Sequence, residues 1–316
     1  MGDLGQASLY LVTGAMTAYL VSMIAFAIDL TGKAASRTPA LVAAGASTAP
    51  TSTGVGAPDA PEATPSGRVR KAARIGMSTF WVATALLLAG LVTRGLAAGR
   101  VPWANMYEFT LVGILVASFV FLGIQRTRDV RYVGTFVAGA GVVGLFLALT
   151  VLYVDAEPVQ PILENYWLVI HVAVATAGMG VFGVGAVFSG LQIAKDRAVT
   201  SGKEQGRVLS SLPAADVMDR LAYRINAVGF VLWTFTLISG AIWAEHAWSR
   251  YWGWDPKEVV SLIIWVIYAA YLHARATRGW EGRKASWFSI IGFIATLVNF
   301  YGVNLFVNSL HSYSGL

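Results

Sequence analysis

Long apolar runs separated by short polar segments dominate the pattern of hydrophobic and polar positions along this 316-residue chain. A helix needs about twenty consecutive, mostly apolar residues to cross the hydrocarbon core of a bilayer. Eight runs approach or exceed that length, and each predicts one transmembrane helix. They lie at residues 7–30, 76–97, 104–124, 132–154, 166–190, 225–243, 259–274 and 286–308. The expected fold is therefore all-α, a polytopic membrane helix bundle of about eight transmembrane helices.

Basic residues are distributed unevenly among the polar segments. Every second segment is rich in Lys and Arg, and these segments together hold 19 of the 23 basic residues. Because cytoplasmic loops carry an excess of Lys and Arg, this alternation predicts that the basic segments lie in the cytoplasm and that both termini lie on the outer side. The basic segments contain Lys33, Arg37, Arg68, Arg70, Lys71, Arg74, Arg126, Arg128, Arg131, Lys195, Arg197, Lys203, Arg207, Arg220, Arg224, Arg275, Arg278, Arg283 and Lys284, and the other segments keep Arg94, Arg100, Arg250 and Lys257.

The composition supports the same class of protein. Hydrophobic residues make up 56% of the chain and charged residues 13%, with a mean hydropathy of +0.61, whereas soluble domains carry roughly 25% charged residues. A water-soluble globule and a disordered chain are therefore excluded. The net charge of +6 resides in the basic loops, so it does not indicate nucleic-acid binding. The chain contains no cysteine, and it therefore supplies no disulfide, thiolate metal ligand or thiol nucleophile.

A stretch rich in Pro, Ala, Ser and Thr follows the first span. Residues 39–66 contain five prolines and too few large apolar side chains for a core. We therefore expect 31–74 to be a flexible cytoplasmic linker. The chain then divides into an N-terminal region, 1–98, with two spans and the linker, and a second region, 99–316, with the remaining spans.

Two histidines at matched depth are the first candidates for chemistry. His171 lies one to two turns inside the outer end of the fifth span, and His311 lies just past the outer end of the eighth. A single histidine at membrane depth is about as often a partner in an interhelical hydrogen bond as a functional group. Two histidines on the same side can also supply both axial positions of a haem iron. His273, near the cytoplasmic end of the seventh span, lies apart from this pair, and His246, in an outer loop, is interpreted as structural.

The outer loop 243–258 is unusually rich in tryptophan. Trp248, Trp252 and Trp254 fall within seven residues, which is denser than the aromatic belt that membrane proteins carry at their interfaces. Large rigid ring faces at the membrane surface suit a flat apolar macrocycle, so these residues are candidates for a cofactor platform. An interfacial belt remains the alternative interpretation.

Polar residues of the same loop also have local roles. Asp255 is suited to the N-cap of the seventh span, with Pro256 at the first helical position and Glu258 completing a capping box. Such a cap would hold the tryptophan loop rigidly over the membrane. Arg250 either pairs with a carboxylate such as a haem propionate or is a solvated loop arginine.

The segment from Trp243 to Glu258 strongly resembles the tryptophan-rich WWD motif of haem-handling membrane proteins. Within that group the chain is similar to the CcsA (ResC) family of System II cytochrome c biogenesis. The resemblance extends over 99–313, and the first two spans and the linker match in character only. Four further segments carry it, namely 99–108, 166–172, 271–275 and 301–313.

This resemblance implies a function and a set of site residues. The chain would be the haem-binding subunit of a cytochrome c synthetase in the bacterial plasma membrane, with haem-lyase activity only together with the membrane partner CcsB (ResB). It would present haem b at the outer face for thioether attachment to the Cys-x-x-Cys-His motif of apocytochrome c. His171 and His311 would be the axial ligands of that external haem. His273 would ligate haem in a transmembrane site whose second ligand comes from the partner. The implied platform consists of Trp248, Trp252, Trp254 and Asp255.

Two other functions remain open. The WWD motif also occurs in System I proteins, which pass haem to a chaperone, although eight spans and the segment around His311 favour System II. A secondary transporter would bind its substrate at the bilayer midplane, between broken helices that carry buried charges. In this chain the polar residues gather at the outer face instead.

Overall fold

The computed structural model describes residues 2–45, 67–156, 165–202 and 206–311, and within these ranges the regular secondary structure is entirely helical. Eight segments are long and apolar enough to cross a membrane, which confirms the predicted all-α bundle. The elements are α1 (Gly2–Gly45), α2 (Gly67–Ala98), α3 (Met106–Thr127), α4 (Arg131–Thr150), α5 (Tyr166–Thr200), α6 (Arg207–Ser211), α7 (Ala215–Trp248), α8 (Pro256–Arg278), α9 (Arg283–Leu297), the π-helical turn η2 (Val298–Val303) and α10 (Asn304–Phe306).

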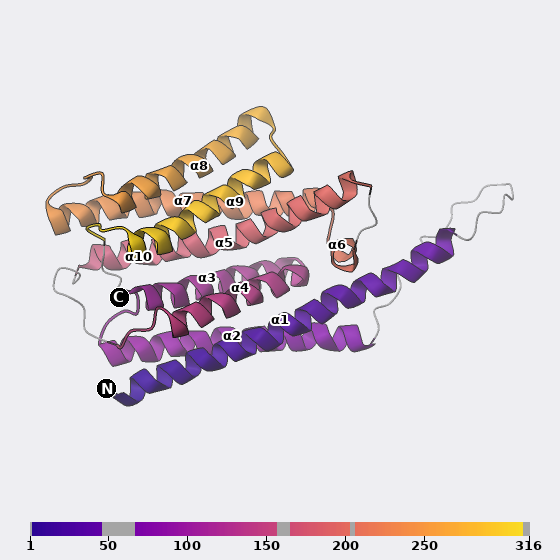
Figure 1. Ribbon diagram of the computed structural model, residues 1–316, viewed down its shortest axis with the longest axis horizontal. Coiled ribbons are helices and arrows are strands. Elements are labelled where there is room, and N and C mark those ends of the chain that lie inside the picture. Colours follow the sequence, from indigo (N-terminus) through magenta and orange to yellow (C-terminus); the bar gives the residue numbers. More distant parts are fainter. Residues whose placement is uncertain (1, 46–66, 157–164, 203–205, 312–316) are drawn as a thin grey trace.

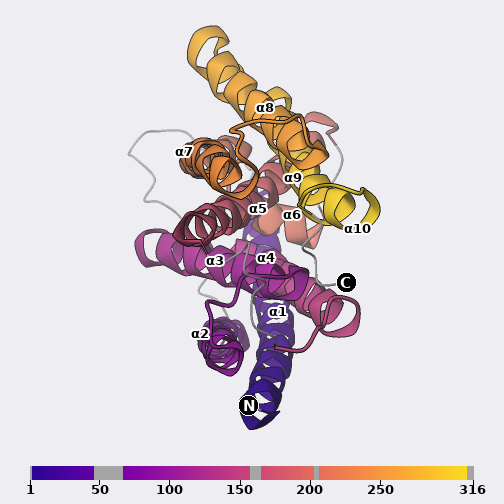
Figure 2. The ribbon, with the colours of Figure 1, turned by 90° about the vertical axis from the view of Figure 1, so that its left-hand side faces the viewer.

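The long helices lie side by side along one axis and form two groups (Figure 1). In the first group α1 packs against α2 and α4, and α3 packs against α4. In the second group α5 packs against α7 and α9, and α8 packs against α9. Contacts between α3 and α5 join the two groups, so that α1 and α2 lie at one side of the bundle and α8 at the other (Figure 2). The division predicted at residue 98/99 stays a prediction.

The two ends of the bundle differ in character. The start of α1, the start of α5, the loop between α7 and α8, and α10 all lie at one end, which we call the Trp-loop end (Figure 1). The connections α3–α4, α5–α7 and α8–α9, which belong to the basic segments, lie at the opposite end. The charge alternation in the sequence therefore corresponds to two opposite ends of the molecule. The assignment of the basic end to the cytoplasm stays a prediction.

Several helices extend beyond the predicted spans. α1 continues to Gly45, α5 continues to Thr200, and α7 begins at Ala215. A search for apolar residues finds only the part of a helix that lipid surrounds, whereas backbone hydrogen bonding carries the helix on into polar sequence. The predicted linker 31–74 is consequently helical at both of its ends, and its central residues, 46–66, lie outside the described residues.

Small residues allow the N-terminal helices to approach closely. The ring of Phe26 on α1 lies against Gly76 of α2 and Gly134 of α4, where an added Cβ would come within 2.9 Å and 2.7 Å of ring carbons. The hydroxyl of Tyr19 also lies 2.6 Å from the Ser118 hydroxyl on α3. Inside a bilayer, close packing and interhelical hydrogen bonds of this kind hold helices together because lipid removes the hydrophobic driving force.

A buried ion cluster joins three segments at the Trp-loop end. Glu108, in the first turn of α3, is fully buried and pairs with Arg94 of α2 at 2.9 Å and with Arg100 at 2.6 Å. Arg94 also donates to the carbonyl oxygens of Val154 and Asp155, at 2.7 and 2.9 Å. The cluster therefore fixes the chain that follows α4 to the adjoining ends of α2 and α3.

Candidate functional site

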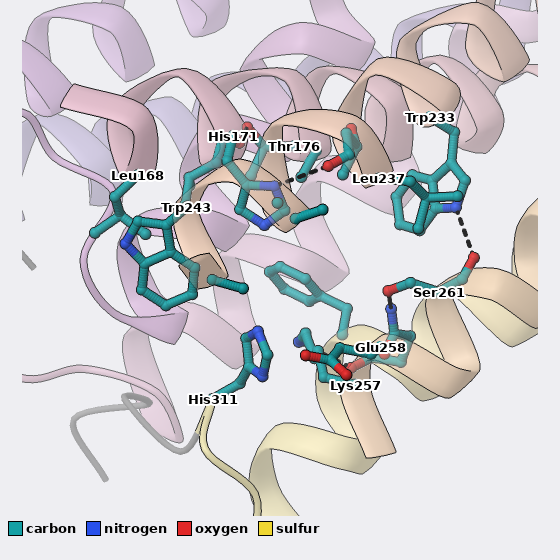
Figure 3. Close-up of a pocket in the computed structure, with 18 of the residues that line it drawn as sticks. Leu168, His171, Thr176, Trp233, Leu237, Trp243, Lys257, Glu258, Ser261 and His311 are labelled. Carbon is teal, nitrogen blue, oxygen red and sulfur yellow. Dashed lines mark hydrogen bonds between the residues drawn. The ribbon is translucent and has the colours of Figure 1, made fainter. Parts of the chain in front are cut away.

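A cavity opens at the Trp-loop end between α5, α7, α8 and the η2–α10 segment (Figure 3). Its empty space is about 1150 Å³, a figure that includes the open solvent at its mouth. Among the described residues that line it, only Phe109 comes from the α1–α4 group. The second group of helices therefore builds the site.

His171 projects from α5 into this cavity (Figure 3). Its Nδ1 lies 3.0 Å from the carbonyl oxygen of Thr236 on α7. A carbonyl oxygen only accepts, so Nδ1 carries the proton and Nε2 carries a free lone pair. The imidazole is stacked on Trp243 at an interplanar angle of 10°. Gly240 leaves the space that the ring occupies, because a Cβ there would lie 2.7 Å from His171 Cε1.

His311 reaches the same cavity from the segment after α10 (Figure 3). Its Nδ1 lies 3.0 Å from Oδ1 of Asp255, and the backbone N–H of Leu310 donates to the other carboxylate oxygen at 2.9 Å. Burial lowers the pKa of His311 despite the opposing effect of Asp255. Burial alone would raise the pKa of Asp255, but N–H groups from Leu310 and Lys257, together with His311, hold it below its usual value. The pair thus consists of a carboxylate and an imidazole whose Nδ1 proton is fixed, which leaves Nε2 as a ligand.

The cap at the start of α8 holds the tryptophan loop in shape. Asp255 accepts from the backbone N–H of Lys257 at 3.0 Å, and Pro256 occupies the first helical position. Glu258 accepts from the backbone N–H groups of Asp255 and Gly253, at 3.1 and 2.8 Å. The predicted capping box is present. Asp255 therefore belongs to the helix cap and to the support of His311 rather than to the cavity wall.

The predicted loop 243–258 is shorter in the structure, because α7 continues to Trp248 and α8 begins at Pro256, so that only residues 249–255 join the two helices. The tryptophans of residues 243–258 occupy three kinds of position. Trp252 lines the cavity, and so does the buried Trp243. Trp248 packs behind the wall, with its ring centroid 4.8 Å from that of Trp243 and 5.0 Å from that of His311. Trp254 is 72% exposed and adopts a left-handed backbone with φ of 59°. Of the three tryptophans predicted as a platform, the structure places only Trp252 on the cavity itself.

The remaining candidates lie outside the cavity. Arg250 pairs with Glu258 at 3.3 Å and lies over the Trp248 ring. His246 is exposed, and its Nδ1 lies 2.8 Å from the carbonyl oxygen of Ile242 in the same helix. His273 is an exposed residue far along α8, which puts it about 26 Å from the start of that helix at 1.5 Å per residue. The structure brings together His171 and His311 but neither of the other histidines.

Several lining residues were absent from the site predicted from sequence. A lysine, two asparagines and two aromatic residues belong to this set, and most of them lie where an apolar span meets the Trp-loop end. The available signal was the presence of polar side chains at the Trp-loop ends of two spans. These residues are Trp243, Lys257, Asn299, Phe300 and Asn304.

The arrangement defines what the cavity can bind. Two imidazoles, each with Nδ1 engaged and Nε2 unprotonated, enter a largely aromatic and apolar cavity, one from α5 and one from the segment after α10. Metal-binding histidines commonly donate the other ring N–H to a carbonyl or carboxylate, as both do here. Rigid aromatic walls provide the faces on which a planar ring packs. The residues present therefore fit a planar macrocycle whose central metal takes two axial nitrogen ligands.

Comparison with known proteins relates the chain to cytochrome c biogenesis. Residues 103–311 match the family described as Cytochrome C assembly protein. The cytochrome c biogenesis protein CcsA of Gloeothece citriformis is 34% identical over 288 residues, which cover 76% of this chain and 87% of that protein. The protein of the same name from a Synechococcus strain is 35% identical over 272 residues, which cover 78% of this chain and 88% of that protein.

A solved structure shares the fold. The protein titled Cytochrome c Heme Lyase CcmF superimposes with a TM-score of 0.65 over 94% of this chain, at 16% sequence identity. The chain spans 46% of the length of that protein, so the likeness concerns the arrangement of helices alone.

Proposed function

The chain belongs to the cytochrome c assembly protein family and is a multi-pass membrane protein of cytochrome c maturation, and from this premise we propose that it is the haem-binding subunit of a System II cytochrome c synthetase. It holds haem b between His171 and His311 and presents it at the Trp-loop end. That end is the extracytoplasmic side of a bacterial plasma membrane in this proposal.

One observation carries the proposal. The two histidines line the same cavity although 140 residues separate them, and each has its Nδ1 fixed by an acceptor of its own. Two neutral imidazoles that approach one space can supply both axial ligands of a six-coordinate haem. With both axial positions occupied, dioxygen has no open site on the iron, and a reduced haem is protected while it waits for its acceptor.

The chemistry divides between this chain and its acceptor. The chain has no cysteine, so the thiols that form the thioethers belong to the Cys-x-x-Cys-His motif of apocytochrome c. Each thiol S–H adds across one vinyl C=C of the haem, and the bond needs no external oxidant or reductant. This chain contributes position, because holding a reactant in one orientation is worth several kcal/mol of the barrier. The histidine of the acceptor motif then replaces one axial ligand.

The partner and the inner site belong to the same proposal. We assign to CcsB (ResB) the role of membrane partner, and to His273 a second haem site toward the basic end of the bundle. The exposure of His273 supports this assignment, because an exposed side chain on α8 is open to a ligand supplied by another chain.

Absorption spectra of variants test the external site. We would purify the chain with its partner and record reduced spectra of the wild type, His171→Ala, His311→Ala and His246→Ala. We expect the low-spin bis-histidine spectrum to disappear in the first two variants and to return in part when imidazole is added. The exposed His246 provides the matched control, and its variant should retain the wild-type spectrum.

Two results would contradict the proposed function. If all three variants keep the wild-type spectrum, His171 and His311 do not ligate haem and the proposed function is wrong in its central element. If His246→Ala also loses the spectrum, residues outside the cavity are needed for haem ligation, and the cavity is not the haem site.

A further inference from the structure

Lys257 brings a positive charge into the wall of the cavity. It is the second residue of α8, and its ammonium donates to the backbone carbonyl of Asn299 at 3.1 Å and to Oδ1 of Asn304 at 2.7 Å. The amide nitrogen of Asn304 donates to the sulfur of Met106, which turns the amide oxygen toward the lysine. Figure 3 shows the lysine next to Glu258, in the same lower part of the view as His311.

The charge of this lysine has no counterpart within the described residues. Apart from histidines, Lys257 and Glu258 are the charged side chains among the described residues that line the cavity. Glu258 pairs with Arg250 and accepts two backbone N–H groups. Asp255 is engaged by His311. No described carboxylate forms an ion pair with Lys257, although an unmatched charge in an apolar wall costs free energy.

The polar groups around the ammonium are also incomplete. An ammonium has three N–H groups, and the described residues accept two of them. Asn299 donates through Nδ2 to Ser261 at 2.9 Å, while its buried Oδ1 has no hydrogen-bond partner among the described residues. Asn299 lies in the π-helical turn η2, and such turns are frequent at functional sites. At this corner of a mostly apolar cavity, the ammonium of Lys257 has room for an anionic partner and the Oδ1 of Asn299 has room for a hydrogen-bond donor.

We propose that the Lys257 ammonium binds a carboxylate of the ligand held between His171 and His311. This inference rests on the proposed function, because haem carries two propionates on one edge of its ring. A single charged contact at that edge fixes the rotation of the ring about the axis that joins the two histidines. The vinyl groups, on the part of the ring remote from the propionates, are then turned away from Lys257. The lysine therefore determines which edge of the ring the acceptor thiols meet.

Arg250, the loop residue that the sequence offers for the same role, is less suited to it. Its guanidinium is engaged by Glu258 and by the Trp248 ring, and it does not line the cavity. Arg250 therefore serves as the matched comparison for Lys257.

A comparison of two ligands on four proteins tests the assignment. The complex of chain and partner, freed of haem, is titrated with haem and with haem dimethyl ester, in which both propionates are neutral. The proteins are the wild type, Lys257→Gln and Arg250→Gln, with Lys257→Arg as the charge-preserving variant. The readouts are the dissociation constant from the absorbance change and the low-spin spectrum at saturation, neither of which depends on synthetase activity.

We expect the wild type to bind the ester at least ~10-fold more weakly than haem, the effect of one charge-assisted hydrogen bond. In Lys257→Gln the two ligands should bind within about twofold of each other. Lys257→Arg and Arg250→Gln should retain most of the discrimination.

Four outcomes would overturn the assignment. They are equal binding of both ligands by the wild type, full discrimination in Lys257→Gln, loss of discrimination in Arg250→Gln, and an equal loss of both ligands in Lys257→Gln. The last would give the lysine a purely structural role. The proposed function is tested separately, by whether the bis-histidine spectrum requires His171 and His311. Any of these four outcomes would therefore overturn the role of Lys257 without contradicting the proposed function.

Discussion

The imidazole Nδ1 of His311 lies 3.0 Å from a carboxylate oxygen of Asp255, although 56 positions separate the two residues. The same carboxylate caps α8 and accepts the backbone N–H of Leu310. One side chain therefore caps the start of α8, holds Leu310 and His311 of the segment after α10, and determines which nitrogen of His311 is free. A carboxylate in this position also raises the basicity of the imidazole as a metal ligand.

Replacing Asp255 by Asn should separate these roles. Asparagine is about as good an N-cap as aspartate, so the helix start should survive, but the charge next to His311 is lost. We expect haem affinity to fall about 10- to 100-fold, as for other residues that support a metal ligand, with little change in thermal stability. Haem titration and a melting curve measure the two effects. An unchanged affinity would mean that the carboxylate has no part in ligation.

Gly240→Ala, on α7, should displace the His171 ring through steric contact, although His171 itself is unchanged. The new methyl group would lie 2.7 Å from Cε1 and 2.9 Å from Nδ1 of the imidazole, so the ring has to move. We expect a reduced spectrum like that of His171→Ala, with partial recovery on adding imidazole. Gly190→Ala is the control, since its Cβ would meet nothing nearer than 4.0 Å. Identical spectra for the two alanine variants would contradict the position of His171.

Trp252 and Trp254 should differ in their effect on haem binding. Trp252 lines the cavity, whereas Trp254 is largely exposed. Trp252→Ala should therefore weaken haem binding in a titration, by several-fold or more, because it removes a ring face worth about 0.5–1.5 kcal/mol beyond its buried area. Trp254→Ala should leave the dissociation constant within about twofold. A larger loss in Trp254→Ala would mean that the loop closes over the ligand in another conformation.

The buried ion cluster should dominate the stability of the α2–α3 junction. Glu108→Gln leaves two arginines beside a neutral amide, and removing one partner of a buried pair costs about 3–5 kcal/mol. A clear fall in the thermal unfolding temperature in detergent is expected. Asp216→Asn breaks the exposed pair with Arg220, where both side chains are more than half exposed, and should change nothing measurable. Equal melting temperatures for the two variants would show that the buried cluster is dispensable.

Replacing His273 by Ala should leave the external site intact. The residue lies far along α8 and does not line the cavity. When haem is added to the purified complex from solution, His273→Ala should lose only the haem of the proposed inner site and keep the low-spin spectrum of the haem that depends on His171 and His311, with wild-type affinity. Loss of that spectrum would place His273, directly or through the fold, in the ligation of the external haem.

Local signals in the sequence were sufficient for much of this fold. The apolar runs located the eight candidate spans found in the described residues, because the bilayer imposes a minimum length that composition alone reveals. The cap at Asp255, Pro256 and Glu258 was also predictable, since capping depends on residues within three positions of one another.

Contacts between distant segments were not predictable in the same way. The stacking of Trp243 on His171 follows from how α5 packs against α7, and no spacing within either helix encodes it. The approach of Asp255 to His311 likewise depends on where the last helix ends. Lys257 was visible as one of the few basic residues outside the basic segments, but its acceptors belong to η2 and α10. Sequence periodicity therefore locates the helices, whereas the residues that complete the site emerge only from their packing.

The two supports of the histidines differ in kind. His171 is held by a main-chain carbonyl of α7, which no substitution of Thr236 can remove, whereas His311 is held by a side chain. The acceptor for His171 is therefore present whatever side chain stands at 236, whereas the acceptor for His311 depends on the side chain at 255. For any metal complex bound between the two histidines, substitution of residue 255 would change the ligand strength of His311 and with it the redox potential of the metal. The ligand strength of His171 would stay the same.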